Sequence, residues 1–514
     1  MNKLVLAVSV GLLAILTACG GGSMGTPIPL PLPPPPAPPT VNATVTVNST
    51  TSGQFDLAMS TSFQPAEWDY QFFQSSLNAK TTLLGNLQPH HIRLQGISQG
   101  VPQTSPTAWS FTVLDAITQP VLGVGDNSPE FQIAKAPPFM YTNNGASNQD
   151  TFLDTSYSQF AGYAQNLVRY YNQGGFTAPD GPHVSPSGLP IQWWGIYNEP
   201  TINNFTGMTG ATDYTKMYNK VVPLMQQADT SGTLKFVALE LCCDSSDSWP
   251  PVFAAGVTAQ VDAVAVHYYS SCNQRDLDQQ IFNTVPGFAS DVQNIYGILQ
   301  GPSANPALAN IPIWITENNV NADFNAGNGM SACNPGQTFV TDQRGSSAFF
   351  AAWRPYVFSQ VGKAGARALY HWDFDADAQF GEVDYNTAQT QLSYWVDYWL
   401  GKTFPASSGQ QVLQFSNTNN SEIEVLPILN TDGSVVIMIS NHAVASASDN
   451  NGDGLTANVS VDVSALGPFT TASLFTIDST TSAINGPGSA ASISPNSPIM
   501  VTVKGYGVAF LSLK

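Results

Sequence analysis

One pattern recurs from residue 55 to residue 405: a short apolar run typical of a buried strand, followed in most cases by a stretch with helical periodicity. We expect strands at residues 55–60, 91–94, 131–136, 191–197, 234–239, 263–266, 313–316 and 368–370. The helical stretches between them include residues 69–78, 111–117, 157–171, 216–227 and 348–361. Strands that alternate with helices pair in parallel, and about eight such units close into a barrel. The sequence therefore predicts an α/β fold with a (β/α)8 TIM barrel over residues 46–405.

After residue 405 the apolar pattern changes to a period of two. Residues 435–440, 459–463, 472–477 and 507–513 alternate like strands, and the turns between them are rich in Gly, Asn, Asp and Ser. We therefore expect residues 406–514 to form a β-sandwich accessory domain that packs on the barrel.

The N-terminus has the features of a targeting signal. An apolar run over residues 4–16 is too short to span a bilayer. It ends in Leu-Thr-Ala-Cys at residues 16–19, which resembles the signal of a bacterial lipoprotein that is cleaved to leave a lipid-modified Cys19. An ordinary secretory signal with a chance cysteine is the alternative. A Gly/Pro-rich linker over residues 20–45 contains a proline run that predicts a stiff spacer of about 40 Å. We therefore expect an exported protein, lipid-anchored to the bacterial cell envelope.

The charge of the chain narrows the range of partners. The 514 residues include 35 acidic and 16 basic side chains, which gives a formal net charge of −19. Such a surface repels phosphate backbones and anionic lipid, so we expect no nucleic-acid partner and no membrane contact besides the lipid anchor. Aromatic residues and many uncharged hydrogen-bonding side chains suit neutral sugars, although exported β-rich proteins share this composition.

Two of the expected strands end in a glutamate. Residues 194–200 read Trp-Gly-Ile-Tyr-Asn-Glu-Pro and include Glu199, and residues 313–319 read Ile-Trp-Ile-Thr-Glu-Asn-Asn and include Glu317. In such barrels the catalytic residues lie at the carboxyl ends of the strands. Two carboxyl groups held there are what cleavage of a glycosidic bond needs, because one donates a proton to the leaving oxygen while the other attacks the anomeric carbon.

Both motifs resemble those of the clan A retaining glycoside hydrolases, and their separation fits strands four and seven of that barrel. Within the clan the chain is most similar to glycoside hydrolase family 39. This similarity is carried by residues 111–115, 136–140, 262–269 and 370–372. The chain departs from the family at Tyr197, where Trp is usual, and at Asn318, where an aromatic residue is common.

The resemblance implies a double displacement with Glu199 as the general acid/base and Glu317 as the nucleophile. Asn198 would hydrogen-bond the sugar 2-hydroxyl, a contact that strengthens as the ring flattens toward an oxocarbenium ion. Retention of configuration predicts carboxyl groups about 5–5.5 Å apart. This mechanism needs neither a cofactor nor a metal ion, and we expect none.

Four further residues complete the site that the resemblance implies. Arg93 and Tyr269 would donate hydrogen bonds to an ionised Glu317, and His267 would belong to the same polar shell. Trp372 would form the floor on which the apolar face of the sugar lies. Each also has a structural interpretation, because Arg93 could simply neutralise a barrel carboxylate, and His267 and Trp372 could belong to the core.

Four cysteines follow expected strands near the same end of the barrel: Cys242, Cys243, Cys272 and Cys333. Export favours their oxidation. Either Cys272 pairs with Cys333 and Cys242 with Cys243, or each of the adjacent cysteines forms a bridge to one of the other two. Zinc is disfavoured because no CxxC pair exists.

Residues 449–454 imitate the start of a calcium-binding loop. The first is Asp449 and the fifth is Asp453, but position twelve is Ser460 rather than the glutamate that supplies two oxygen ligands. A polar hairpin turn is therefore the favoured interpretation.

The sequence as a whole predicts a retaining glycosidase with an oligo- or polysaccharide substrate, β-xylosidase-like or a related β-glycosidase, acting on plant or microbial glycans. A catalytically inactive cell-surface carbohydrate-binding protein on the same barrel is the alternative. The pair Glu199 and Glu317, together with Asn198, favours the enzyme. Uronic acids are disfavoured as substrates because few basic residues are available to neutralise the substrate carboxylate. Exo or endo action depends on loops such as residues 96–109 and 321–343.

Overall fold

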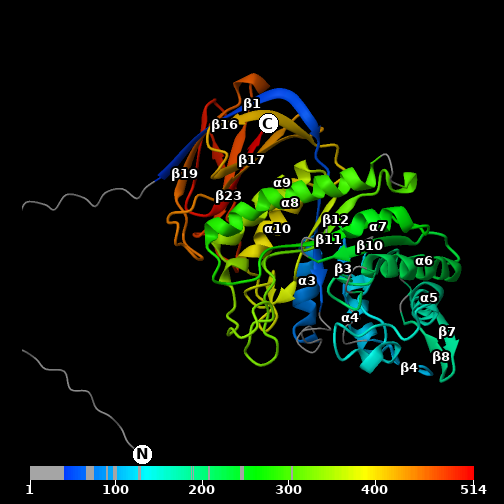
Figure 1. Cartoon of the computed structure of the whole chain (residues 1–514). Helices are drawn as coiled ribbons and strands as arrows, with labels where there is room; N and C mark the ends of the chain where they lie inside the picture. Colours follow the sequence, from blue (N-terminus) through cyan, green and yellow to red (C-terminus); the bar gives the residue numbers. More distant parts are fainter. Residues whose placement is uncertain are drawn as a thin grey trace, which may run out of the picture. The chain divides into compact units, whose positions relative to one another are not determined.

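The computed structural model describes residues 40–514, apart from residues 65–73, 88–90, 96–100, 125–128, 187, 189, 206–208, 243–247 and 302–304 (Figure 1). The predicted signal over residues 1–19 with Cys19, linker residues 20–39 and the first half of the helix expected at residues 69–78 lie outside the described residues. Among the helices of the described part, none combines the length and the apolar character that a membrane span requires.

Eight parallel strands form a closed barrel. In chain order they are β2 (Ala58–Phe63), β3 (Ile92–Leu94), β6 (Glu130–Ile133), β9 (Trp193–Ile196), β10 (Lys235–Leu241), β11 (Ala263–Ser271), β12 (Ile313–Asn321) and β13 (Ala368–His371). Pairing of β13 with β2 closes the ring. Each strand overlaps one of the predicted apolar runs, because strands of a parallel barrel are buried on both faces.

A helix follows each barrel strand (Figure 1). The helices are α3 (Leu77–Leu87), α4 (Thr112–Leu122), α5 (Ser158–Gln173), α6 (Gly210–Ala228), α7 (Trp249–Gly256), α8 (Asp278–Leu299), α9 (Ala348–Lys363) and α10 (Leu392–Thr403). The sequence predicted α4, α5, α6 and α9 but not α7, α8 or α10. The alternation of strand and helix confirms the TIM barrel.

The barrel interior changes from apolar to polar along its axis. Toward the amino ends of the strands, Ala58, Val237, Ala265, Trp314 and Tyr370 pack as one buried layer. The buried charged side chains of Arg93, Glu240, His267 and Glu317 lie toward the carboxyl ends, and Glu130, the first residue of β6, lies beside Glu240. The apolar layer fills the barrel at the amino ends of its strands. The polar cluster therefore faces the carboxyl end, where such barrels have their catalytic residues.

The remaining long strands form a second, mixed sheet. They are β1 (Thr40–Gln54), β16 (Gln411–Asn417), β17 (Ile423–Leu429), β18 (Val435–Asn441), β19 (Thr456–Asp462), β20 (Ala472–Asp478), β21 (Ala491–Ile493), β22 (Ile499–Val503) and β23 (Gly507–Leu513). Hydrogen bonds join them in the order β21-β20-β23-β18-β17-β16-β1-β19-β22. The sheet encloses its own core, which includes Val45, Ile437, Val459 and Leu511. The predicted C-terminal β-rich domain is confirmed.

The first strand of this sheet comes from the other end of the chain. β1 pairs with β16 and, in parallel, with β19. The sequence predicts that residues 40–45 belong to the linker and residues 46–54 to the barrel, but residues 40–54 form β1 of the sheet, which corrects both boundaries. Ala43, Val45 and Val47 are buried in the sheet core, so the alternation that makes this segment a strand was present next to the proline run.

The barrel and the sheet share a hydrophobic core. Helix α9 is buried on almost all sides, because one face covers the barrel and the other contacts the sheet. Phe349 of α9 lies 5.4 Å from the ring of Tyr506, and Phe404 lies 6.3 Å from Phe510. Ser359 and Lys363 of α9 donate hydrogen bonds to the buried carboxylate of Glu424.

The loop at residues 449–454 contributes a polar contact between the same two parts. The backbone N–H groups of Asn451 and Gly452 donate to the two carboxylate oxygens of Asp278, at 2.7 and 2.8 Å. Asp278 is fully buried at the start of α8 and also accepts a hydrogen bond from the hydroxyl of Tyr506. These contacts support the prediction that this loop is a polar turn.

Candidate active site

Irregular backbone at strand ends positions the polar side chains. In β10 the pairing register with β11 shifts between Ala238 and Leu241, and both Leu239 and Glu240 have positive φ angles, of 79° and 47°. In β12 the register with β11 shifts immediately before Glu317. Bulges of this kind turn a side chain to the opposite face of a strand. They explain why Glu240 and Glu317 both point into the barrel.

Glu317 is held by side chains from two strands, Arg93 of β3 and both His267 and Tyr269 of β11. Arg93 donates to its Oε1 at 3.0 Å, and the hydroxyl of Tyr269 donates to its Oε2 at 2.8 Å. His267 Nδ1 lies 3.4 Å from the same Oε2. Burial raises the pKa of Glu317 above its usual range, and His267 and Arg93 oppose that rise.

Glu199 faces Glu317 across the mouth of the barrel. It follows β9 with a positive φ of 44°, and its backbone N–H donates to the carbonyl of Glu240 at 3.0 Å. His267 Nδ1 lies 2.9 Å from Glu199 Oε1. One carboxylate oxygen of Glu199 lies within 4.8 Å of one of Glu317. The Glu199 side chain is 18% exposed and that of Glu317 only 6%, so Glu199 lies closer to solvent.

Asn198 has a fixed orientation. Its Oδ1 accepts hydrogen bonds from Arg93 and from the side-chain amide of Gln132, both at 2.9 Å. The amide nitrogen of Asn198 is therefore the group that remains to donate to a ligand.

Arg93 and His267 both contact the carboxylate of Glu240, a residue that the sequence did not predict for the site. Glu240 Oε2 accepts from Arg93 at 3.3 Å and lies 3.1 Å from His267 Nε2. Burial lowers the pKa of His267, but Glu317, Glu199 and Glu240 outweigh it and raise the pKa to about 9. Burial raises the pKa of Glu240, but Arg93 and His267 outweigh it and lower the pKa to about 2. At neutral pH the site thus holds an imidazolium and an ionised Glu240.

Glu130 is a second carboxyl group that the sequence did not predict for the site, and it lies beside Glu240. A methyl group on Gly195 of the intervening strand β9 would lie 2.7 Å from Glu130 Oε1 and 3.0 Å from Glu240 Oε1, so only glycine leaves room for both. Burial and the charge of Glu240 raise the pKa of Glu130 well above its usual range. The buried site therefore favours the protonated form of Glu130.

Trp372 covers one side of the cluster. It directly follows β13 and packs with Ala376, Phe380 and, in part, Tyr269. The guanidinium of Arg93 lies 5.9 Å from the Trp372 ring centroid. The structure thus brings together all seven side chains predicted for the site, namely Arg93, Asn198, Glu199, His267, Tyr269, Glu317 and Trp372.

Among the described residues, two groups of side chains have a spacing that a metal ion could use. Glu199, His267 and Glu317 form the first, but His267 faces carboxylates through both ring nitrogens and is protonated, which repels a cation. In the second, His371 already contacts Asp397 at 2.8 Å and the carbonyl of Phe380 at 2.7 Å. Neither donor set fits a metal ion well.

A disulfide joins the loops beside the site. Cys272, directly after β11, is bonded to Cys333 in the loop after β12. Of the three pairings that four cysteines allow, this bond belongs to the one with a Cys242–Cys243 bridge, and Cys243 lies outside the described residues.

No protein-family model matches the sequence, and no curated protein matches it. Solved structures do match. A monomeric β-xylosidase from Caulobacter crescentus has a TM-score of 0.62 at 14% identity, covering 92% of this chain and 99% of that one. A family 39 β-xylosidase from the same organism has a TM-score of 0.58 at 13% identity, covering 92% and 100%. A family 30 xylanase from Clostridium acetobutylicum has a TM-score of 0.57 at 15% identity, covering 92% and 99%. The chain therefore has the fold of the clan A glycoside hydrolases, as its motifs predicted.

Proposed function

We propose that this protein is a retaining glycoside hydrolase in which Glu199 is the general acid/base and Glu317 is the nucleophile. The observation that carries the proposal is the separation of the two carboxyl groups, which follow β9 and lie in β12 of one barrel and have oxygens within 4.8 Å of each other. Retaining glycosidases hold this pair about 5–5.5 Å apart, whereas inverting ones leave room for a water molecule between them.

The proposed reaction has two steps. A carboxylate oxygen of Glu317 attacks the anomeric carbon while Glu199 gives its proton to the departing glycosidic oxygen, which forms a glycosyl ester and releases the aglycone. In the second step Glu199 takes a proton from water, the water oxygen attacks the same carbon, and the ester bond to Glu317 breaks. Asn198 would bind the 2-hydroxyl during both steps, since its oxygen is already engaged by Arg93 and Gln132.

The charges around the pair support these roles. Arg93 and His267 place two positive charges beside Glu317 and Glu240. Positive charge beside Glu317 favours the ionised form that a nucleophile needs.

We further propose a neutral β-linked pyranoside, a β-xyloside first, as the substrate. The β-xylosidases and the xylanase with this fold support that choice, and so does the site itself. The cations at the centre, Arg93 and His267, are both engaged by protein carboxylates, so a substrate carboxylate would add an unbalanced charge.

Hydrolysis of aryl β-glycosides with activated leaving groups tests the proposal, using wild type, Glu199→Ala and Glu317→Ala with added azide. We expect azide to rescue Glu199→Ala with formation of the β-glycosyl azide, and to rescue Glu317→Ala with formation of the α-anomer. Full activity in either variant would remove that glutamate from the mechanism. Glycan binding without cleavage of any aryl glycoside would instead favour a carbohydrate-binding protein.

A further inference from the structure

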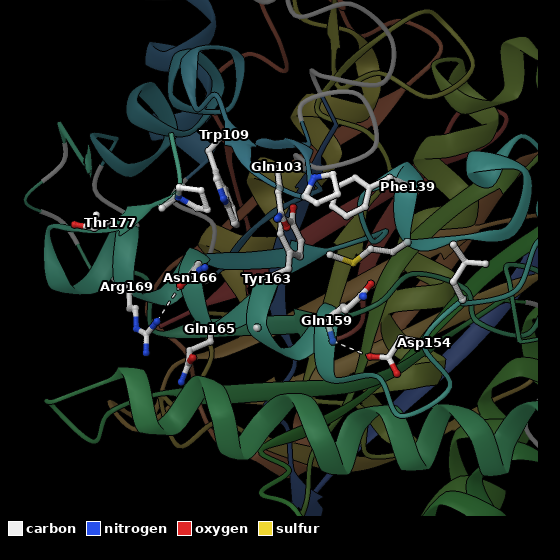
Figure 2. A pocket seen from close by; sticks show the side chains of 16 residues that line it. Gln103, Trp109, Phe139, Asp154, Gln159, Tyr163, Gln165, Asn166, Arg169 and Thr177 are labelled. Atoms are coloured by element: carbon white, nitrogen blue, oxygen red, sulfur yellow. Dashed lines mark hydrogen bonds between the residues drawn. The ribbon is translucent and has the colours of Figure 1, made fainter. Parts of the chain in front are cut away.

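A second pocket lies on the outer wall of the barrel, and none of its lining residues belongs to the candidate active site (Figure 2). One wall is the hairpin of β4 (Gln103–Ser105) and β5 (Ala108–Trp109), and the opposite wall is helix α5. The short helix η1 (Pro138–Met140) and strand β7 (Gly175–Ala178) close its ends. Its volume is about 600 Å³, which is in the range of small-molecule binding sites.

Two buried polar atoms in this pocket have no hydrogen-bond partner in the part of the chain that the structure describes. Gln103 is 9% exposed and Tyr163 is 1% exposed. The Oε1 atom of Gln103 and the hydroxyl of Tyr163 are both buried without a hydrogen bond. They come from opposite walls, one from the hairpin and one from α5 (Figure 2). A buried polar group without a partner destabilises the fold by about 1–3 kcal/mol, so such groups in a pocket indicate a ligand that completes them.

Helix α5 also keeps the pocket open. Gly162 lines the pocket from the middle of the helix, and a methyl group there would meet no atom within 4 Å. Glycine inside a helix is about 1 kcal/mol less favourable than alanine, and here no close packing requires it. Glycine at position 162 therefore keeps this part of the pocket open.

The lining favours a neutral ligand with hydroxyl groups. Phe139 is the half-buried aromatic side chain of the lining, while Trp109 and Tyr163 are buried and stacked on each other at 5.6 Å. The side chains of Gln159, Gln165 and Asn166 add uncharged donors and acceptors. The charged side chains of the lining are one acid and one base, and Arg169 already donates to Asn166 at 3.0 Å.

We propose that this pocket is a second carbohydrate-binding site, which binds a pyranose unit of a neutral glycan through the Gln103 carbonyl oxygen and the Tyr163 hydroxyl. The choice of a glycan as the ligand rests on the proposed glycosidase function. The site would hold a polysaccharide on the barrel wall while another part of the same chain occupies the candidate active site.

Two variants separate binding from folding. Tyr163→Phe removes only the unpartnered hydroxyl, and Gly162→Leu fills the pocket with a side chain that also favours the helix. We expect both variants to be at least as stable as wild type, and both to cleave a small aryl glycoside at the wild-type rate. In the Glu317→Ala background, which keeps polysaccharide intact, we expect Tyr163→Phe to weaken binding about fivefold and Gly162→Leu to abolish the pocket's contribution.

Affinity electrophoresis in gels that contain soluble xylan, mixed-linkage β-glucan, glucomannan or galactomannan measures this binding. The expected result is reduced retardation of both variants on at least one polymer. Unchanged retardation on all four polymers would overturn the second site. Absence of aryl-glycoside hydrolysis in wild type would instead count against the proposed function, because that assay does not involve the pocket.

Discussion

His267 connects carboxylates from three strands, and its protonation links the site to the stability of the fold. Its pKa in the folded protein is about 9, above the ordinary value of 6.5. The protonated form therefore stabilises the fold fully below pH 6.5, and this contribution is lost as the pH rises through 9. A shift of this size corresponds to about 3 kcal/mol in the free energy of unfolding.

The His267→Gln variant measures that contribution, because glutamine keeps a donor and an acceptor but cannot carry the charge. Urea unfolding of wild type and variant at about pH 6 and about pH 10 is expected to show a stability difference that largely disappears at the higher pH. Equal differences at both values would show that the imidazole is not charged in the folded protein.

Glu240 and Glu130 are adjacent carboxyl groups in opposite protonation states, and matched substitutions distinguish them. Glu240→Gln removes a charge that Arg93 and His267 need, so we expect a loss of about 3 kcal/mol in stability and a lower kcat. Glu130→Gln replaces a group that is already neutral, so we expect a change below about 1 kcal/mol. Unfolding curves and aryl-glycoside kinetics of both variants test this contrast, which two similar losses would refute.

Some of the predicted site residues follow regular strand alternation, and Glu199 and Glu317 were predicted from their motifs, but neither signal indicated Glu240. In β11, His267 and Tyr269 continue the inward positions of Ala263 and Ala265, so period-two counting finds them. In β10 the same counting places Glu240 on the outer face. The bulge at this position reverses the alternation, and one sequence does not show where a bulge occurs.

Among the elements, the barrel strands were predictable because each is an apolar run, while β1 and α8 were not. The alternation in β1 lies beside the proline run and was assigned to the linker and barrel, since its partners β16 and β19 are more than 350 residues away. Helix α8 has a proline inside it and polar residues throughout, which weakened its helical pattern.

The contact between α8 and the loop at residues 449–454 depends on one carboxylate. Asp278 accepts two backbone N–H groups from the loop, a hydroxyl from Tyr506 and a charged contact from Arg344 at 3.4 Å. We expect Asp278→Ala to lower the free energy of unfolding by about 3 kcal/mol, because it leaves these buried donors unpaired.

Thermal unfolding with calcium or with a chelator separates this contact from metal binding by the loop. Asp278→Ala is expected to lower Tm, while calcium and its removal leave the Tm of wild type unchanged. A calcium-dependent rise in Tm would restore the calcium-loop interpretation of Asp449 and Asp453.

At the scale of the whole molecule, the sheet domain stabilises the barrel through apolar contact. Helix α9 provides buried side chains to both, and Phe404 at the end of the barrel contacts Phe510 of β23. β1 precedes the barrel in the chain and β16 follows it, so their pairing holds the two ends of the barrel domain together. A sheet joined in this way has a structural role, whatever else it binds.

The candidate active site lies within residues 40–514. We propose that residues 1–39 anchor the protein to a membrane through a lipid on Cys19. Residues 16–19 read Leu-Thr-Ala-Cys, follow a short apolar run and precede a proline-rich spacer, and this order supports the lipid anchor. We expect the full chain, expressed in a bacterium that processes lipoproteins, to enter the detergent phase in Triton X-114 partition, and Cys19→Ser to remain unprocessed. Intact mass should show a lipid-modified N-terminus at Cys19 in wild type alone. A soluble wild-type product cleaved at another residue would support an ordinary secretory signal instead.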